Sequence, residues 1–269
     1  MDEKYLIANW KMNKLPVEVL AFFDKFIIDL RKYINEKKEK RDVLMKDINN
    51  LSLIFAVPFT NMFYANLYAN EEKRIKIASQ NVHHKDEGAY TGEISPLMLK
   101  SIDVLYSIVG HSERRAMGEK ESDFVLKIEG LLKNNMIPIY CVGETKEEKA
   151  KNKTKEVLKK QIGEVLKEIQ KTDVKDQMDK IIFAYEPVWA IGTGDFCKKE
   201  EANENITYIK EEIKKLGIEN PKVLYGGSAN SKNANEYIEN TNIDGLLVGG
   251  ASLDPTEFLN MYINILEKK

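Results

Sequence analysis

Short apolar runs alternate with longer amphipathic segments from one end of the 269-residue chain to the other. The apolar runs are continuous and show no alternation of apolar and polar positions, which is typical of parallel strands buried on both faces. This pattern predicts eight strands, at residues 5–9, 51–57, 75–79, 104–110, 136–143, 180–186, 222–227 and 245–250.

The segments between the apolar runs carry apolar residues at helical spacing. The first of them places Val19, Phe22 and Phe26 on one face. Residues 155–171 repeat this period with Lys and Glu at the other positions, which indicates a solvated outer face. Residues 254–269 begin with Asp and Pro and end with two lysines, in keeping with the polarity of a helix.

Eight strand–helix alternations without a linker or a change in composition predict an α/β fold, a single-domain (β/α)8 barrel over residues 1–269. A doubly wound open sheet is the alternative, because the pattern does not show that the sheet closes. A charged insertion around residues 35–50 separates the first helix from the second strand. We expect it on the helical side, away from the strand ends, as a lengthened helix or a disordered segment.

Charge and composition exclude several classes of function. The chain has 41 Lys and Arg against 43 Asp and Glu, so it has no general basic field for nucleic acid or an anionic membrane. Its apolar runs are too short to span a bilayer, and the acidic start "MDEKYLIANW" is not a secretory signal. The two cysteines, Cys141 and Cys197, argue against a disulfide framework. We therefore expect a cytoplasmic protein with neither nucleic-acid nor membrane partners.

Polar residues and glycines gather where the predicted strands end. In a barrel, the carboxyl ends of all strands open on the same face, so these residues converge on one mouth. The sequence therefore predicts an active site there. The candidate residues are Asn9, Lys11, His111, Glu186, Ser228, Gly226–Gly227 and Gly249–Gly250.

Two of these residues suit acid–base chemistry. Glu186 leaves a buried strand, so desolvation is expected to raise the pKa of its carboxyl and favour proton abstraction. His111 precedes Ser112, which is placed to cap a helix whose N-terminus would keep the imidazole neutral. A neutral imidazole can donate a hydrogen bond to a substrate oxygen. The alternative for His111 is a histidine that only completes the core.

Lys11 and the glycine pairs suit an anion. An inward-facing lysine is costly to bury without a partner, although it can also bend out to solvent. Gly226–Gly227 and Gly249–Gly250 let backbone N–H groups approach a ligand, and loops after the seventh and eighth strands of such barrels commonly hold phosphate. A tight turn explains either pair equally well.

Cofactor motifs are missing from the sequence. There is no GxxxxGK[ST] and no GxGxxG, so a nucleotide cofactor is not expected. His83 and His84 are adjacent and have no ligand-spaced His or Cys partner, so we interpret them as loop residues without a metal.

Six segments, in order along the chain, resemble the motif series of the triosephosphate isomerase family: "NWKMN", "GHSERR", "CVGE", "AYEPVWAIGTG", "YGGS" and "DGLLVGGASL". The resemblance covers nearly the whole chain, and each motif lies at a strand end. It implies a TIM barrel and a glycolytic and gluconeogenic isomerase that interconverts D-glyceraldehyde 3-phosphate and dihydroxyacetone phosphate through an enediolate. No cofactor or metal is implied.

The resemblance also implies roles for individual residues, which are those known for this family. Glu186 is the base, His111 the electrophile, and Lys11 supports the developing negative charge. The loop "PVWAIGTG" is a lid over the phosphate, and Glu113 is a second carboxylate near the histidine. Substrate is bound by Asn9, Lys11, Gly192, Ser228, Gly249 and Gly250.

The segment "GAYTGE", residues 88–93, resembles the family's loop that inserts into a partner subunit. A homodimer is therefore expected, with Thr91 reaching the partner's active site and Tyr90 packing in the interface. Glu93 and Arg114 are expected to form an ion pair there.

Two features depart from the family's pattern. Asp195, Phe196 and Cys197 follow the lid, where the family usually has smaller residues, so lid opening is in question. The insertion around residues 35–50 is the second departure.

Two other functions remain open from the sequence. Another phosphate-binding barrel enzyme, such as an aldolase or an epimerase, would need a Schiff-base lysine or a metal-binding set, and neither is apparent. A barrel retained for partner binding, with weak or lost isomerase activity, would be expected to have an eroded catalytic set, yet Asn9, Lys11, His111 and Glu186 are all present.

Overall fold

The computed structural model describes residues 3–37, 48–191, 196–239 and 241–268. Most of the insertion predicted around residues 35–50 lies outside the described residues, as do Gly192 and Asp195.

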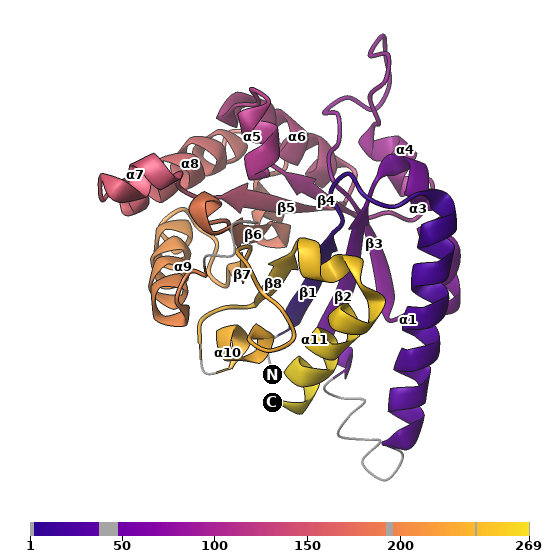
Figure 1. The fold of residues 1–269 in the computed structure, drawn as a ribbon. Coiled ribbons are helices and arrows are strands. Elements are labelled where there is room, and N and C mark those ends of the chain that lie inside the picture. The colour runs from indigo at the N-terminus through magenta and orange to yellow at the C-terminus, as the bar shows by residue number, and fades with distance from the viewer. Residues whose placement is uncertain (1–2, 38–47, 192–195, 240, 269) are drawn as a thin grey trace.

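Eight parallel strands form a closed barrel in sequence order (Figure 1). The first and last strands pair along Tyr5–Ala8 and Gly245–Val248, which closes the sheet and rules out the open-sheet alternative. The predicted strands are thus confirmed. They are β1 (Lys4–Asn9), β2 (Leu51–Val57), β3 (Ile75–Ser79), β4 (Tyr106–Val109), β5 (Ile137–Val142), β6 (Ile182–Tyr185), β7 (Lys222–Tyr225) and β8 (Gly245–Val248).

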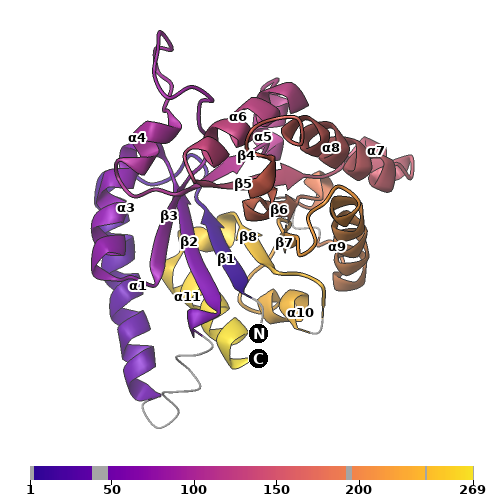
Figure 2. The ribbon, with the colours of Figure 1, turned by 180° about the vertical axis from the view of Figure 1, so that it is seen from behind.

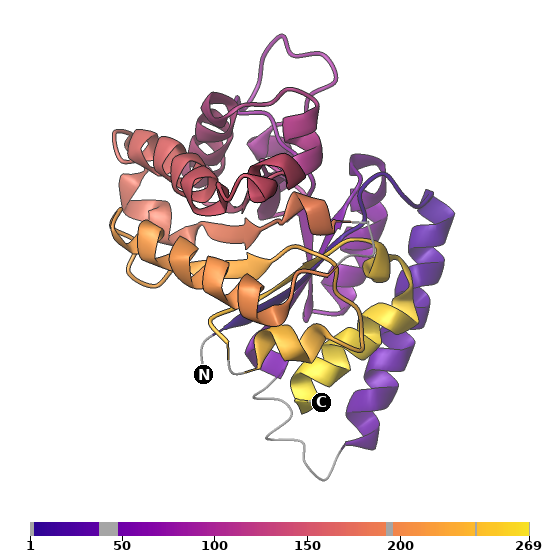
Figure 3. The ribbon, with the colours of Figure 1, turned by 60° about the vertical axis from the view of Figure 1, so that its left-hand side comes forward.

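Helices surround the barrel, as the views from behind and from the side show (Figures 2 and 3). Among the described residues, no helix is both long and apolar enough to cross a bilayer. The helices are α1 (Pro16–Glu36), α3 (Phe59–Glu71), α4 (Pro96–Lys100), α5 (Ser112–Ala116), α6 (Glu121–Lys133), α7 (Lys146–Ala150), α8 (Thr154–Ile169), α9 (Lys199–Lys214), α10 (Ala234–Ile238) and α11 (Pro255–Glu267). Short 3-10 turns are η2 (Lys175–Lys180), η3 (Val188–Ala190) and η4 (Gly250–Leu253).

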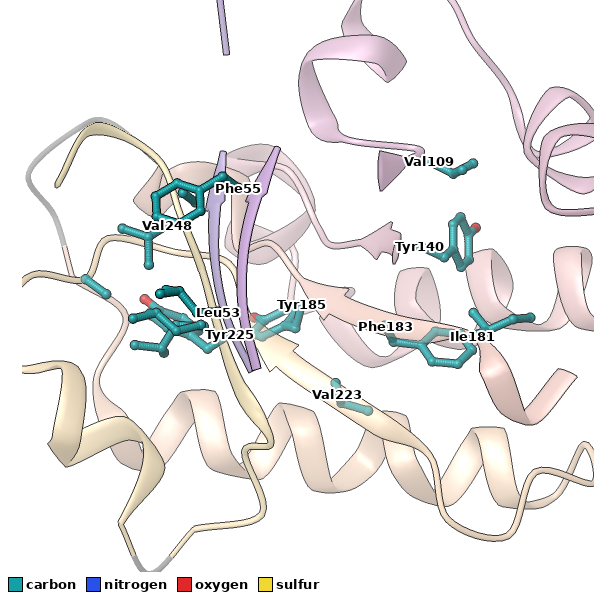
Figure 4. Close-up of a cluster of buried hydrophobic side chains, with 14 of the residues drawn as sticks. Leu53, Phe55, Val109, Tyr140, Ile181, Phe183, Tyr185, Val223, Tyr225 and Val248 are labelled. Atoms are coloured by element: carbon teal, nitrogen blue, oxygen red, sulfur yellow. The ribbon is translucent and has the colours of Figure 1, made fainter. Parts of the chain in front are cut away.

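Strand side chains point alternately into the barrel and out toward the helices, which makes two cores. Ile7, Ile54 and Leu224 belong to the inner core. Phe55 and Phe183 belong to the outer core, part of which is drawn in Figure 4. Because both faces of the strands are buried along most of their length, the strands are mostly apolar, as their sequences predicted, with Lys4, Lys76 and Lys222 as partly buried exceptions.

The helices bury the faces that their sequences predicted. In α1, Val19, Phe22 and Phe26 are buried, and the Phe22 and Phe26 rings stack with centroids 5.9 Å apart. Removing one such side chain from water contributes about 1.5–3 kcal/mol. Helix α11 starts where expected, because the Asp254 side chain accepts the backbone N–H of Glu257 and Pro255 occupies the first turn.

Candidate active site

The loop after β1 brings a cation to the mouth of the barrel. Asn9, the last residue of β1, is buried, and its Oδ1 accepts the backbone N–H of Lys11 at 3.1 Å. Lys11 has a φ of 53°, in the left-handed region, where a non-glycine residue is strained. The Lys11 Nζ lies 2.8 Å from Glu113 Oε1. The lysine therefore pairs with a carboxylate at the mouth and does not extend freely into solvent.

The end of β4 places His111 at the start of α5. The helix begins at Ser112, and His111 itself is the N-cap, with Nδ1 accepting the backbone N–H of Glu113 at 3.2 Å. The expectation that Ser112 caps this helix is therefore wrong. Because Nδ1 accepts a hydrogen bond, the proton of the neutral ring lies on Nε2. That proton points to Glu186, whose Oε1 is 3.0 Å away.

Glu186 follows β6 and is 2% exposed. One carboxylate oxygen faces His111, and the other accepts the backbone N–H of Ser112 at 2.9 Å. A Cβ atom built at Gly226, after β7, would lie 2.9 Å from the Glu186 Cγ, so the absent side chain there leaves room for the carboxylate. The base candidate is thus held between β4, β6 and β7.

The pKa values of this pair differ from the sequence-based expectation. Burial alone would raise the pKa of Glu186, but the facing His111, the Ser112 N–H and the charge of Lys11 together hold it below its ordinary value. Burial alone would lower the pKa of His111, but the Glu186 carboxylate raises it overall. The expected rise for Glu186 is therefore wrong in this arrangement, because the sequence does not show that the two side chains face each other.

A cavity of about 470 Å³ opens in front of these residues. A Cβ atom at Gly249 would lie 3.5 Å from the Lys11 Cε, so the lysine stem passes directly over the turn after β8. Ser228 contacts the loop after β6, since its Oγ donates to the carbonyl of Ala190 at 2.6 Å. The predicted site residues that line the cavity are Asn9, Lys11, His111, Glu186, Gly226, Gly227, Ser228, Gly249 and Gly250.

Other residues also line the cavity, and the sequence-based prediction did not assign them to the site. Asn13 and Asn230 contribute amides, while Phe196 and Leu247 contribute apolar walls. Asn230 comes two residues after Ser228 and was accessible to motif reasoning. Leu247 lies within β8, where its inward orientation follows only from the barrel.

The turn after β6, which the sequence predicts to begin a lid, is attached to the loop after β5. The Trp189 Nε1 donates to Glu144 Oε1 at 2.8 Å, and the Val188 N–H donates to the Glu144 carbonyl at 3.1 Å. Glu144 is completely buried. Burial raises the pKa of its carboxyl, and this effect outweighs the hydrogen bonds from Trp189 and Tyr185, which lower it. At the far end, the Cys197 carbonyl accepts the Tyr237 hydroxyl at 2.7 Å.

Metals in proteins are held by characteristic arrangements of titratable side chains. Among the described residues, no group of three or more His, Cys, Asp or Glu side chains is arranged to hold a metal ion. His83 and His84 lie in the loop after β3, where their rings pack 4.3 Å apart.

The cavity combines a buried carboxylate that faces an imidazole with a lysine and a glycine-rich turn. This arrangement is typical of a barrel enzyme that moves protons on a small anion. The chain matches the family model described as triosephosphate isomerase over residues 4–265. It therefore belongs to the triosephosphate isomerase family and is an isomerase with a TIM barrel.

Curated relatives agree with this assignment. The triosephosphate isomerase of Dictyoglomus thermophilum is 40% identical over 97% of this chain and 99% of its own length. The corresponding protein of Alkaliphilus oremlandii is 39% identical over 97% and 99%. That of Aquifex aeolicus is 40% identical over 95% and 96%. These likenesses do not favour a barrel kept only for partner binding.

Proposed function

We propose that the protein interconverts D-glyceraldehyde 3-phosphate and dihydroxyacetone phosphate, with Glu186 as the base and His111 as the electrophile. The observation that carries the proposal is the 3.0 Å contact between Glu186 Oε1 and His111 Nε2, beside Lys11. A carboxylate and an imidazole that already face each other need only a substrate between them to act on neighbouring carbon and oxygen atoms.

The reaction starts when Glu186 turns from His111 and Ser112 toward the substrate. Its carboxylate takes a proton from C1 of dihydroxyacetone phosphate, and the C–H electrons form the C1–C2 double bond of an enediolate. The C2 carbonyl electrons move to oxygen, where the His111 Nε2–H supports the charge. Proton transfer between the two oxygens through His111, and return of the proton from Glu186 to C2, gives the aldehyde.

Movement of Glu186 also changes the pKa values of the pair. Away from His111, the carboxylate keeps its burial and loses its partner, so its pKa rises toward that of an effective base. His111 loses the carboxylate that raised its pKa, and its Nδ1 still accepts the Glu113 N–H. The imidazole therefore stays neutral when the enediolate forms.

The phosphate binds at the other end of the cavity in this proposal. Lys11 supplies a positive charge, while Ser228, Gly249 and Gly250 supply the loops after β7 and β8. Gly192, outside the described residues, would contribute from the lid. Closure of the lid excludes water and prevents the enediolate from losing phosphate.

We also infer a homodimer formed through residues 88–93, with Thr91 directed at the partner's site. The loop between β3 and α4 projects beyond the helices (Figures 1 and 2). Tyr90 in this loop is 43% exposed, and Met12, after β1, is 96% exposed. Large apolar side chains exposed on the surface are typical of an interface. The predicted Glu93–Arg114 pair would form between subunits.

We place this activity in the cytoplasm. Cys141 and Cys197 are both buried and unpaired, which suits a reducing compartment.

The test is a metal-free assay of glyceraldehyde 3-phosphate conversion in the parent and in Glu186→Asp. The shorter carboxylate withdraws from the carbon, which is expected to lower kcat roughly 100-fold. Glu164→Asp, an exposed position on α8, is the matched control and should leave the rate unchanged. A folded parent without isomerase activity, or a Glu186→Asp variant as fast as the parent, would contradict the proposal.

A further inference from the structure

The turn after β8 is held from behind by the loop after β1. Gly249 and Gly250 face the cavity at the start of this turn. On the far side, the Trp10 Nε1 donates to the Ser252 carbonyl at 3.1 Å, and the Lys14 Nζ donates to the Leu253 carbonyl at 2.8 Å. Two side-chain donors from the loop after β1 thus fix the C-terminal end of η4.

The position of Lys14 is specified by several contacts. Its φ of 72° is in the left-handed region, which is strained for a non-glycine residue. Its carbonyl accepts the side-chain amide of the fully buried Asn61 at 2.8 Å. Its Nζ lies 4.8 Å from the ring centroid of Phe22 and 5.2 Å from that of Trp10. A strained backbone that persists under such contacts suggests a use for the side chain.

Lys14 and Lys11 differ in the partners of their charged groups. Within the part of the chain that the structure describes, Lys14 makes no salt bridge, whereas Lys11 pairs with Glu113. Glu18 and Asp254 are the acidic groups that influence it, and burial outweighs them in lowering its pKa. A cation behind the glycine turn therefore adds attraction for an anion bound in front of it.

We propose that Lys14 is a positioning residue for the phosphate group of the substrate. It holds η4 through the Leu253 carbonyl so that the backbone at Gly249 and Gly250 faces the phosphate, and it contributes positive charge behind that turn. Lys14 does not line the cavity, so it acts through the turn and not by contact with the substrate. The inference rests on the proposed phosphate-binding role of Gly249 and Gly250.

Three variants test this role. Lys14→Met keeps the apolar stem over the rings but removes both the donor and the charge, and Lys14→Arg keeps both. Lys25→Met removes one positive charge from the exposed surface of α1 and is the matched control. For each protein we would measure the inhibition constant of inorganic phosphate, the rise in Tm that phosphate causes, and KM and kcat for glyceraldehyde 3-phosphate.

The expected result is a selective loss of phosphate affinity. Lys14→Met should weaken phosphate binding and raise KM by about tenfold, with kcat changed less than about threefold, because the reacting carbons are at the other end of the cavity. Lys14→Arg should lie within about threefold of the parent, and Lys25→Met should match it. If Lys14→Met does not fold, Lys14→Gln, which is neutral and shorter, should show the same tenfold loss.

Several results would overturn the inference. Unchanged phosphate affinity in Lys14→Met or Lys14→Gln would remove the role, as would equal losses in the Met and Arg variants. If the parent isomerises substrate and binds phosphate while Lys14→Met matches it, only this inference fails. If the parent does not isomerise substrate and its Tm does not rise with phosphate, the proposed function fails. The inference about Lys14 then fails too, because it rests on that function.

Discussion

Glu186 and His111 hold each other in a resting arrangement. The carboxylate is ionised beside an imidazole that donates to it, and both side chains are buried. In the proposed mechanism this contact must break before Glu186 can reach the substrate, so the free energy of the pair adds to the barrier to productive binding. The same contact makes the stability of the fold depend on pH.

Replacing His111 by Gln should cost stability in a limited pH window. The pKa of His111 is raised above 6.5, so its contribution is complete below pH 6.5 and is lost as the pH rises through the raised value. The pKa of Glu186 is lowered below 4.5, so its contribution is complete above pH 4.5 and is lost as the pH falls through the lowered value. Denaturant unfolding of parent and variant from pH 4 to 9 should show the largest difference between about pH 4.5 and 6.5.

His84 provides a control of opposite sign. Burial, followed by the charge interactions with His83, Lys85 and Lys127, lowers its pKa, so protonation of His84 opposes folding. His84→Gln should therefore gain stability relative to the parent as the pH falls.

For the His111→Gln variant, a stability difference from the parent that stays constant with pH would show that the Glu186–His111 pair carries no net charge interaction.

Residue types at the strand ends identified the pair, but not its geometry. Glu186 and His111 were found because each follows an apolar run, and the barrel brings such positions together. Their pKa directions depend on a 3.0 Å contact between residues 75 positions apart. Lys14 was missed as a functional residue for the same reason, since nothing local links it to the carbonyl of Leu253.

At the scale of elements, the loop after β5 and the residues directly after β6 lie in direct backbone contact. A Cβ atom at Gly143 would lie 1.8 Å from the carbonyl oxygen of Glu186. The next residue, Glu144, then binds the lid through Trp189 and Val188. The close approach at Gly143 thus sets the position of both Glu186, the proposed base, and the proposed lid.

Gly143→Ala is expected to destabilise the fold by about 3 kcal/mol, because backbone atoms cannot yield as a flexible side chain can. Activity should fall as well, since Glu186 must shift. Gly163→Ala, in α8, is the matched control: a Cβ there has nothing within 4 Å. That change should stabilise by about 0.5–1 kcal/mol, as removal of a helical glycine does. Comparable unfolding midpoints for the two variants would refute the argument.

Element positions were largely predictable from the sequence. Continuous apolar runs located every strand, and the segment from Asp254 gave α11 with its cap. The start of α5 was not predicted correctly, because the side chain of His111 caps this helix and histidine is not a usual capping residue. The charged insertion remains a prediction, because most of it lies outside the described residues.

At the scale of the whole molecule, the loop between β3 and α4 projects from the single chain. Tyr90 packs on His83 with ring centroids 4.2 Å apart, yet much of it is exposed. If the loop enters a second subunit, each site is completed by its neighbour, and activity depends on protein concentration.

Tyr90→Asp should weaken the dimer by at least tenfold, because a charge would be buried in the interface. Sedimentation velocity at micromolar protein should show more monomer, with a parallel loss of specific activity. Ile28→Asp, on the exposed face of α1, is the control and should leave the dimer intact. A parent that sediments as a monomer would rule out the interface altogether.

Closure of the barrel was the least local of the predictions. Alternating strands and helices are compatible with open and closed sheets, and only the pairing of β1 with β8 separates the two. That pairing depends on the whole chain, which is why the sequence left the alternative open.

The pairing of β1 with β8 also has a consequence for the synthesis of the chain. Trp10 binds the carbonyl of Ser252, 242 residues further along the sequence. A nascent chain emerging from the ribosome therefore carries Lys11 and Asn9 from the outset but has no turn against which to set them until the last strand has left the exit tunnel. Prematurely terminated chains should be inactive and not partly active, and the cell must protect an open sheet edge until translation is complete.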